Sequence, residues 1–216
     1  MEPLVLVISG SMGAGKTTLM AEASDLLGAA GVVHAAIDLD ALSIGHLPPE
    51  SISVSELNLA LLWKSYAALG VTRLIIAGAI ESAARLAEVR GALPHAHILI
   101  CRVRARIATM QERVRQREPG MLQREFVERV VLLDEELDSA ALHDFEVDNE
   151  ARGVTAAARE ILEIAGWLPR AAPEPKCPHC GNGAGIYLAP REERSPEAPI
   201  RCLACRADAP ATQWMA

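Results

Sequence analysis

The stretch that decides the fold is ISGSMGAGKTTLM, residues 8–20. It follows an apolar run, Leu4 to Ile8, whose β-branched residues predict a buried parallel strand. From Gly15 to about Ala29 the pattern becomes helical. Residues 10–17 match G-x-x-x-x-G-K-[ST] between that strand and that helix, which is the context in which this motif binds phosphates.

Glycines in such a loop let backbone N–H groups turn inward around phosphate oxygens, and the positive end of the helix dipole adds to the attraction. We expect Lys16 to reach the β- and γ-phosphates and the Thr17 hydroxyl to bind Mg²⁺. A glycine-rich turn that only joins strand to helix is disfavoured, because every fixed position of the motif matches. The predicted nucleotide contacts are Gly10, Ser11, Met12, Gly13, Ala14, Gly15, Lys16, Thr17 and Thr18.

The rest of the first 167 residues alternates between short apolar runs and longer helical patterns. Such alternation builds βαβ units, so the predicted fold class is α/β, a three-layer αβα sandwich with a five-stranded parallel sheet. A capping box of Ser53 and Glu56 marks the start of one helix. The expected strands are 4–8, 32–38, 73–77, 96–103 and 144–147, and the expected helices are 15–29, 53–69, 81–90, 104–117, 121–140 and 154–165.

Length and composition limit the organisation and the partners. The 216 residues suffice for one well-cored domain with a small appendage. A Pro/Ala-rich stretch predicts a linker over 168–176, between domains 1–167 and 177–216. The net charge of −7 argues against a surface that coats nucleic acid. No run approaches the roughly 20 apolar residues that span a bilayer, and the N-terminus does not resemble a signal peptide, so we expect no membrane partner and a cytoplasmic location.

Four of the five cysteines form two C-x-x-C pairs, Cys177/Cys180 and Cys202/Cys205, separated by 21 residues. This spacing is close to that of a zinc ribbon, and without an export signal it favours zinc over disulfides. A segment of about 40 residues cannot bury enough apolar surface to fold alone, so a structural Zn²⁺ is expected to stabilise it.

The surface of the predicted ribbon is nearly balanced in charge, which weakens a nucleic-acid function. Tyr187 and Trp214 could either stack on bases or hold the hairpin together. Nucleic acid is therefore not a favoured partner, and a homodimer stays open. The balanced charges are Arg191, Arg194, Arg201 and Arg206 against Glu192, Glu193, Glu197 and Asp208.

Asp38 and Asp40 follow the second predicted strand and share one face in extended geometry. Ligands collect at the carboxyl ends of parallel strands, so these carboxylates are expected near the γ-phosphate, unless they form only a solvated acidic loop. The third predicted strand has no aspartate or glutamate directly at its C-terminal end. Glu81 comes later, in the expected first turn of the next helix, and Gly78 either leaves room for an acceptor or makes a tight turn.

Arg113 and Arg117 are four residues apart and project from one helical face, just before Pro119-Gly120. Arginines beside a flexible segment can close over a triphosphate and stabilise charge on the transferred phosphoryl group. The alternative is an exposed helix with ion pairs to Glu112 and Glu118.

Residues 1–167 resemble the small-molecule kinases of the P-loop superfamily, such as shikimate, gluconate, adenylylsulfate and adenylate kinases and chloramphenicol phosphotransferase. The resemblance rests on the phosphate loop, the D-x-D of Asp38-Leu39-Asp40, Gly78 and the arginine pair. It implies ATP-dependent phosphoryl transfer to a hydroxyl group of a small-molecule acceptor, which is the expected partner.

The resemblance also implies roles for single residues. Asp38 would lie near Mg²⁺ or the acceptor hydroxyl, acting as base or metal ligand, and Asp40 would contact the acceptor. Arg113 would pack on adenine and Arg117 would touch phosphate. The loop after the last strand, with Asp148 and Asn149, would border the adenine.

No acceptor-binding signature of a single member is found, and the glycine triplet of shikimate kinase is missing after the third strand. The acceptor therefore stays open. Two rival functions remain: a polynucleotide end kinase or other nucleic-acid-processing ATPase guided by the ribbon, and a nucleotide-binding regulatory protein without acceptor chemistry.

Overall fold

The computed structural model describes residues 2–44, 54–150, 152–170, 176–180, 185–188 and 195–214. The chain divides into two compact units, Met1–Leu168 and Pro169–Ala216, and each is described by itself. The expected capping residue Ser53 and residues 171–175 of the expected linker lie outside the described residues. Among the helices that are described, none is long and apolar enough to cross a membrane.

A five-stranded parallel sheet forms the centre of the first unit, which confirms the predicted α/β class. The strand order is β2-β3-β1-β4-β5. Because every strand runs in the same direction, all carboxyl ends meet at one edge, where the phosphate loop follows β1. The strands are β1 (Leu4–Ser9), β2 (Ala35–Asp38), β3 (Arg73–Ala77), β4 (His97–Arg104) and β5 (Phe145–Asp148).

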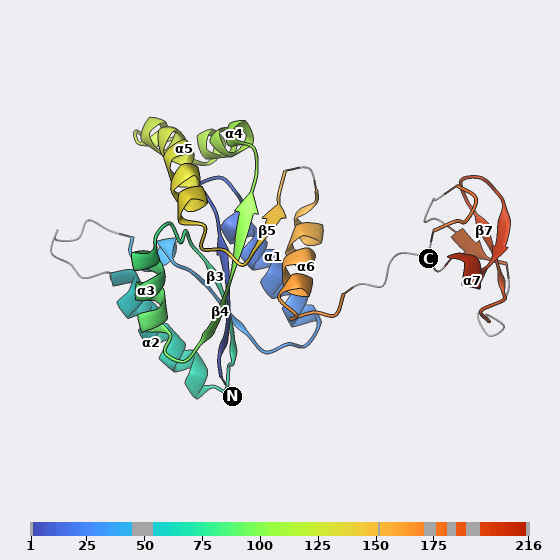
Figure 1. Ribbon diagram of the computed structural model, residues 1–216, viewed down its shortest axis with the longest axis horizontal. Helices are drawn as coiled ribbons and strands as arrows, with labels where there is room; N and C mark the ends of the chain where they lie inside the picture. Colours follow the sequence, from blue (N-terminus) through green and yellow to red (C-terminus); the bar gives the residue numbers. More distant parts are fainter. Residues whose placement is uncertain are drawn as a thin grey trace. The chain divides into compact units, whose positions relative to one another are not determined.

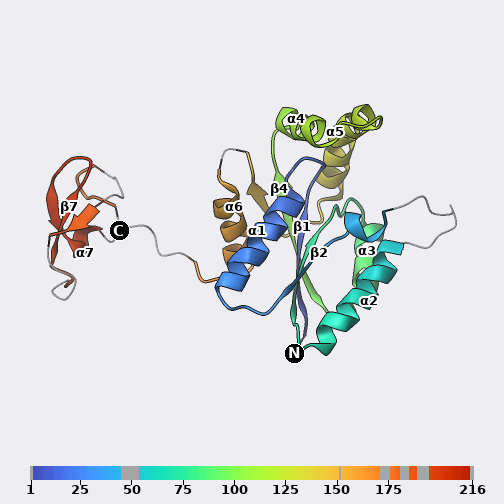
Figure 2. The same ribbon diagram turned by 180° about the vertical axis from the view of Figure 1, so that it is seen from behind.

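Helices cover both faces of this sheet and so complete the predicted three-layer sandwich (Figures 1 and 2). Alternate residues of β1 belong to separate core clusters: Leu6 and Ile8 pack with α1 and α6, and Val5 and Val7 pack with α2 and α3. The paired helices α4 and α5 lie at the carboxyl edge of the strands (Figure 1). The helices are α1 (Lys16–Ala29), α2 (Val54–Ala68), α3 (Ala83–Ala92), α4 (Ile107–Arg117), α5 (Gln123–Ala140) and α6 (Val154–Ile164), with the short 3-10 helix η1 (Asp40–Leu42) after β2.

Five predicted element boundaries are wrong by two or three residues: the start of β2, both ends of α3, and the starts of α4 and α5. Helix α3 begins at Ala83, because the hydroxyl of Ser82 accepts a hydrogen bond from the backbone N–H of Arg85 at 3.1 Å and caps the helix. Glu81 therefore precedes the helix and does not lie in its first turn. Strand β2 is shorter than predicted, because Val32 instead donates its N–H to Leu27 and closes the end of α1. Helix α4 starts late because Arg104 still pairs with β5.

The second unit is a three-stranded antiparallel sheet followed by a short helix. Trp214 is 1% exposed in its small core, and a Cβ on Gly185 would lie 2.6 Å from the indole ring. Of the two roles considered for Trp214, the structure thus supports holding the hairpin together. The elements are β6 (Gly185–Tyr187), β7 (Pro199–Cys202), β8 (Asp208–Pro210) and α7 (Ala211–Trp214).

Candidate active site

The phosphate loop packs tightly against its neighbours, which explains its glycines. Gly13 and Gly15 have left-handed φ angles of 77° and 101°, which side-chain-bearing residues rarely adopt. A Cβ on Gly13 would collide with the backbone of Met110 in α4, and one on Gly15 would collide with the side chain of Asn149. The loop therefore keeps its shape only while these positions carry no side chain.

Residues after β5 and in α4 hold the carbonyl side of the loop. Asn149 is buried and donates from Nδ2 to the Ala14 carbonyl at 2.8 Å. Arg113 donates to the Gly13 carbonyl at 3.2 Å and to the Asn149 carbonyl at 3.1 Å. The structure thus brings Arg113 and Asn149 together with the loop, as predicted residues of one site. Asp148 lies at the exposed end of β5 and accepts the Glu150 N–H at 2.6 Å.

Helix α5 supports the loop from another side. The buried Ser11 hydroxyl donates to the Val130 carbonyl of α5 at 2.7 Å. This hydrogen bond ties the loop to α5. With Ser11 and Asn149 fixed, the loop is pre-organised for a phosphate group.

Thr17 and Asp38 meet directly, although 21 residues separate them. The Thr17 hydroxyl donates to Asp38 Oδ2 at 2.6 Å, and Asp38 Oδ1 accepts the backbone N–H of Asp40 at 3.0 Å. A hydroxyl and a carboxylate are the oxygen ligands that Mg²⁺ prefers. These two residues therefore fit the magnesium site that the sequence predicts.

Lys16 lies within the same group. Its Nζ donates to the Ser11 carbonyl at 3.3 Å. Burial lowers the pKa of Lys16 below its ordinary value, and the nearby Asp40 and Asp38 oppose this effect. An ammonium group that is shielded from water interacts more strongly with phosphate oxygens than one in bulk water.

Asp40 lines two cavities. The smaller, of about 80 Å³, lies against the phosphate loop, Lys16, Thr17 and Arg117. The larger, of about 390 Å³, is lined by Asp40, Ala79, Glu81, Arg85, Glu88, Arg129 and Leu133. Asp40 therefore borders both the cavity at the phosphate loop and a larger polar space.

Arg117 also lies beside the phosphate loop. It lines the small cavity and, with Gly13, Gly15, Thr18, Arg113 and Gln116, a further one of about 360 Å³. Its side chain is 60% exposed and pairs with Glu118 at 2.9 Å. The surface ion pair considered from the sequence is thus present, and it leaves Arg117 beside the loop.

Gly78 is explained by packing. A Cβ at this position would lie 2.7 Å from Cδ1 of the buried Leu39. The close approach of β2 and β3 at their ends therefore requires a glycine. A contact of Gly78 with the acceptor stays a prediction.

Three charged residues near the larger cavity were missed by sequence reasoning: Glu56, Arg85 and Arg129. Glu56 of α2 is only 8% exposed, accepts the Ser55 hydroxyl at 2.8 Å and pairs with Arg85 of α3. Arg129 of α5 lines the same cavity. The sequence carried one signal, because Glu56 falls on the same helical face as the buried Leu59, and a carboxylate on an apolar face needs a partner.

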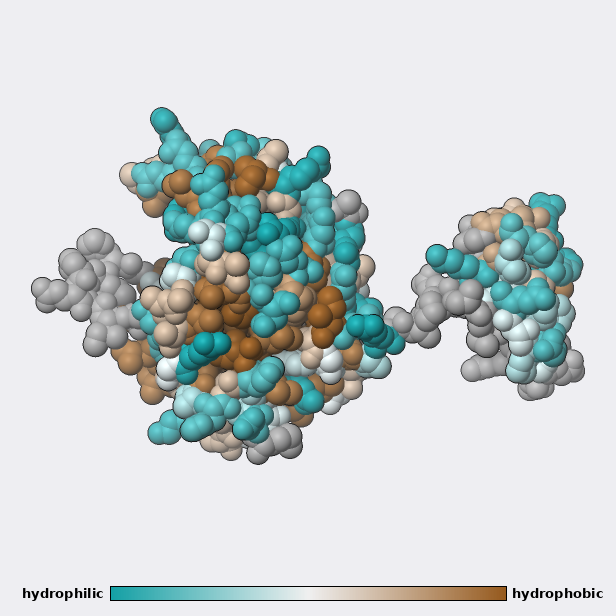
Figure 3. All heavy atoms as spheres, viewed as in Figure 1, coloured by the Kyte–Doolittle hydropathy of each residue, from teal (hydrophilic) through white to brown (hydrophobic). Residues whose placement is uncertain are grey.

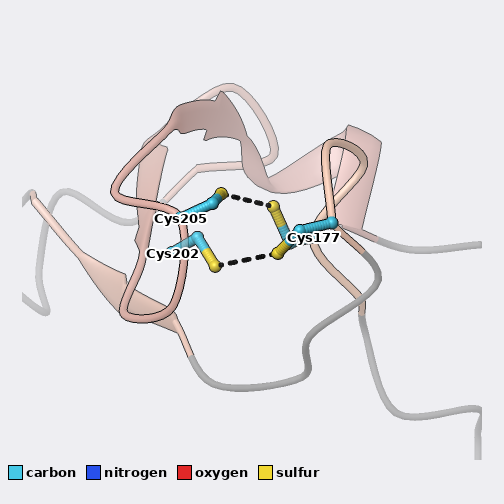
Figure 4. Close-up of side chains that lie close together, drawn as sticks. Cys177, Cys202 and Cys205 are labelled. Atoms are coloured by element: carbon cyan, nitrogen blue, oxygen red, sulfur yellow. Dashed lines mark hydrogen bonds between the residues drawn. The ribbon is translucent and has the colours of Figure 1, made fainter.

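The four cysteines of the second unit converge on one point (Figure 4). Their sulfurs all lie within 4.8 Å of one another, with Cys177 and Cys205 3.7 Å apart and Cys180 and Cys202 3.6 Å apart. A tetrahedral zinc with bonds of about 2.3 Å places its sulfurs about 3.8 Å apart, whereas a disulfide requires about 2.05 Å. The cluster therefore fits the predicted structural zinc and contains no disulfide.

One arginine of the second unit, Arg201, is already paired with a carboxylate. Arg201 makes two hydrogen bonds to Asp208 across β7 and β8, at 2.7 and 2.8 Å. Arg191 and Arg194 lie outside the described residues.

Comparisons with known proteins agree with this fold. Neither a protein-family model nor a curated protein sequence matches the chain. An APS kinase from Mycobacterium tuberculosis has a TM-score of 0.54 at 17% identity, covering 76% of this chain and 98% of its own. The Deinococcus radiodurans tunicamycin resistance protein has a TM-score of 0.55 at 19% identity, covering 78% and 98%. Shikimate kinase from Acinetobacter baumannii has a TM-score of 0.50 at 16% identity, covering 79% and 97%.

At these identities the likeness establishes the fold. The neighbours include P-loop small-molecule kinases, so the resemblance predicted from the sequence is confirmed at that level, and the four-cysteine cluster fits the predicted zinc ribbon.

Proposed function

We propose that the chain is an ATP- and Mg²⁺-dependent phosphotransferase that moves the γ-phosphoryl group to a hydroxyl of a small molecule. The observation that supports this best is the position of Asp40, which lines both the phosphate-side cavity and the cavity of about 390 Å³. An ATPase needs space only for water, whereas a kinase needs a site for a second substrate beside the phosphates.

Each residue has a defined part in this proposal. Lys16 and the loop N–H groups bind the β- and γ-phosphates. Thr17 and Asp38 would hold Mg²⁺, and the bound ion would neutralise charge on the phosphates. Asp38 also lies where a base could accept the proton of the acceptor hydroxyl, and Asp40 orients that hydroxyl.

The remaining predicted residues border the nucleotide. Arg113 holds the loop in position and, with Asp148 and Asn149, lies at the adenine side, while Arg117 approaches the phosphates. The zinc of the ribbon is structural, since four thiolates close its coordination shell. A cytoplasmic location accords with a zinc site made of four cysteines, because free thiols stay reduced in the cytoplasm.

A screen with γ-labelled ATP against metabolites, antibiotics and oligonucleotides tests the proposal. Lys16→Ala should lower turnover at least about a hundredfold while circular dichroism shows an intact fold. Lys64→Ala, which removes the same charge from an exposed position of α2, is the matched control and should retain activity. Unchanged transfer by Lys16→Ala would refute the assignment.

The rivals give different results in the same screen. Slow hydrolysis without any labelled product favours a nucleotide-binding regulatory protein. Labelling confined to oligonucleotides, with strong salt sensitivity, favours a polynucleotide end kinase.

Asp38→Asn separates chemistry from binding. Because the amide keeps the shape of the carboxylate but loses its charge, phosphoryl transfer should disappear while ATP still binds, as measured by calorimetry. Loss of ATP binding instead would assign Asp38 a purely metal-holding or structural role.

A further inference from the structure

A second cavity continues the space beside Asp40. It measures about 590 Å³ and lies between the start of α3 and the C-terminal half of α5. Glu81 lines both this cavity and the one beside Asp40. We call the two together the acceptor groove; the second is lined by Glu81, Ser82, Ala83, Leu132, Glu135, Glu136, Ser139, Ala140 and Leu142.

The arginines of the acceptor groove are already engaged. Arg85 pairs with Glu56 and, at 3.3 Å, with Glu88. Arg129 makes two hydrogen bonds of 2.7 Å to Glu136, and it attracts Glu81 only at longer range. Both guanidinium groups already pair with carboxylates of the protein. Neither is therefore free to bind an incoming anion.

The carboxylates of the groove outnumber these cations. Within the described part of the chain, Asp40, Glu81 and Glu135 make no ion pair. Around Glu81 and Glu135 the groove therefore carries a negative potential, and this potential opposes the binding of a carboxylate or phosphate group there.

The groove also has an apolar side. Leu132 is 53% exposed, and Ala83, Ala140 and Leu142 lie beside it in the lining. Figure 3 shows hydrophobic surface on this face, beside α3 and below α5, surrounded by polar side chains. An exposed leucine in a concave surface favours contact with an apolar part of a ligand.

We infer that the acceptor is a cationic hydroxyl compound, an amine-bearing alcohol or sugar with an apolar portion. Its hydroxyl lies at Asp40, its ammonium group lies between Glu81 and Glu135, and its apolar part packs on Leu132. This inference rests on the proposed function and names the substrate class of the same site.

The experiment compares pools of hydroxyl compounds grouped by charge: primary amines, their N-acetylated neutral counterparts, and carboxylates. Each pool is incubated with γ-labelled ATP, and in parallel its effect on the melting temperature is measured with a non-hydrolysable ATP analogue and Mg²⁺. The best acceptor should come from the amine pool, and its N-acetylated counterpart should be poorer.

Charge-removing variants test the position of the ammonium group. Glu81→Gln and Glu135→Gln should each lower kcat/KM for the amine about two- to fivefold and leave the neutral counterpart within about twofold. Glu128→Gln removes the same charge from the same helix as Glu135, at a residue paired with Arg124 that does not line the groove, and should change neither value.

A carboxylate or neutral compound as best acceptor overturns the inference, and so does an amine whose kcat/KM is unaffected by both variants. A melting shift by amines alone, lost in Glu81→Gln but without labelled product in any pool, supports the groove and contradicts the phosphotransferase. Neither labelling nor a melting shift contradicts both.

Discussion

Glycine at three loop positions allows separate parts of the chain to approach the phosphate loop. Gly10 lies against Val103 of β4, Gly13 against Met110 of α4, and the Gly15 backbone against Asn149. The shape of the loop is thus determined as much by α4 and by the residue after β5 as by its own sequence.

Two glycine substitutions should have opposite effects on stability. Gly13→Ala places a Cβ into the Met110 backbone at a left-handed φ, so we expect a loss of at least about 2 kcal/mol and of ATP binding. Gly28→Ala lies in α1 with no atom within 4 Å of the new Cβ, so a gain of about 0.5–1 kcal/mol is expected. Urea unfolding measures both; equal effects would show that the loop tolerates a side chain.

Sequence reasoning placed Lys16, Thr17 and Asp38 in one site because a local motif and the strand edge rule suffice for them. It missed Arg85 and Glu56, because their pairing joins α2 and α3 across 29 residues and has no local pattern.

At the scale of elements, α5 contacts the phosphate loop and also lines the acceptor groove. Its Val130 carbonyl accepts the Ser11 hydroxyl of the loop, and its Leu132 and Glu135 line the acceptor groove. Arg102 of β4, only 1% exposed, fixes this helix through ion pairs with Asp134 and Asp138.

Removing Asp134, the closer partner of Arg102, should lower the free energy of unfolding more than removing Asp138 does. Asp134→Ala leaves a buried guanidinium without its closest carboxylate, so a loss of about 3 kcal/mol is expected. Asp138 is 45% exposed and lies 3.4 Å away, so Asp138→Ala should cost less than about 1 kcal/mol. Chemical denaturation measures both, and a loss for Asp134→Ala that does not exceed the loss for Asp138→Ala would contradict this expectation.

The order of the elements was predictable, since apolar runs and the glycines and prolines between them are local features. Their ends were less so. Helix α3 begins after its cap, Ser82, and not at the predicted Glu81. Strand β2 is shorter than predicted because Val32 donates a hydrogen bond to the end of α1. Both outcomes depend on contacts formed after the elements pack.

At the scale of the whole molecule, the two units differ in what stabilises them. The first has two extended apolar clusters on the two faces of its sheet. Among its described residues, the second has a core cluster of six, Cys177, Ile200, Cys202, Ala209, Ala211 and Trp214, of which two are metal-ligand candidates. We therefore expect metal ligation to supply most of its folding free energy.

Zinc removal should accordingly unfold the second unit alone. A purified chain should contain one zinc per molecule by elemental analysis, and a strong chelator should make residues 169–216 sensitive to protease while residues 1–168 stay resistant and still bind ATP. Cys177→Ser should have the same effect without chelator, because a serine hydroxyl is a poor substitute for a thiolate at zinc. Cys101→Ser in β4 is the control: that thiol is buried in the first unit outside the four-cysteine cluster, and burial raises its pKa, so its loss should leave the zinc content unchanged. If the chelated chain kept its second unit protease-resistant, the cysteines would not be holding a structural metal; if ATP binding fell together with zinc, the two units would be coupled.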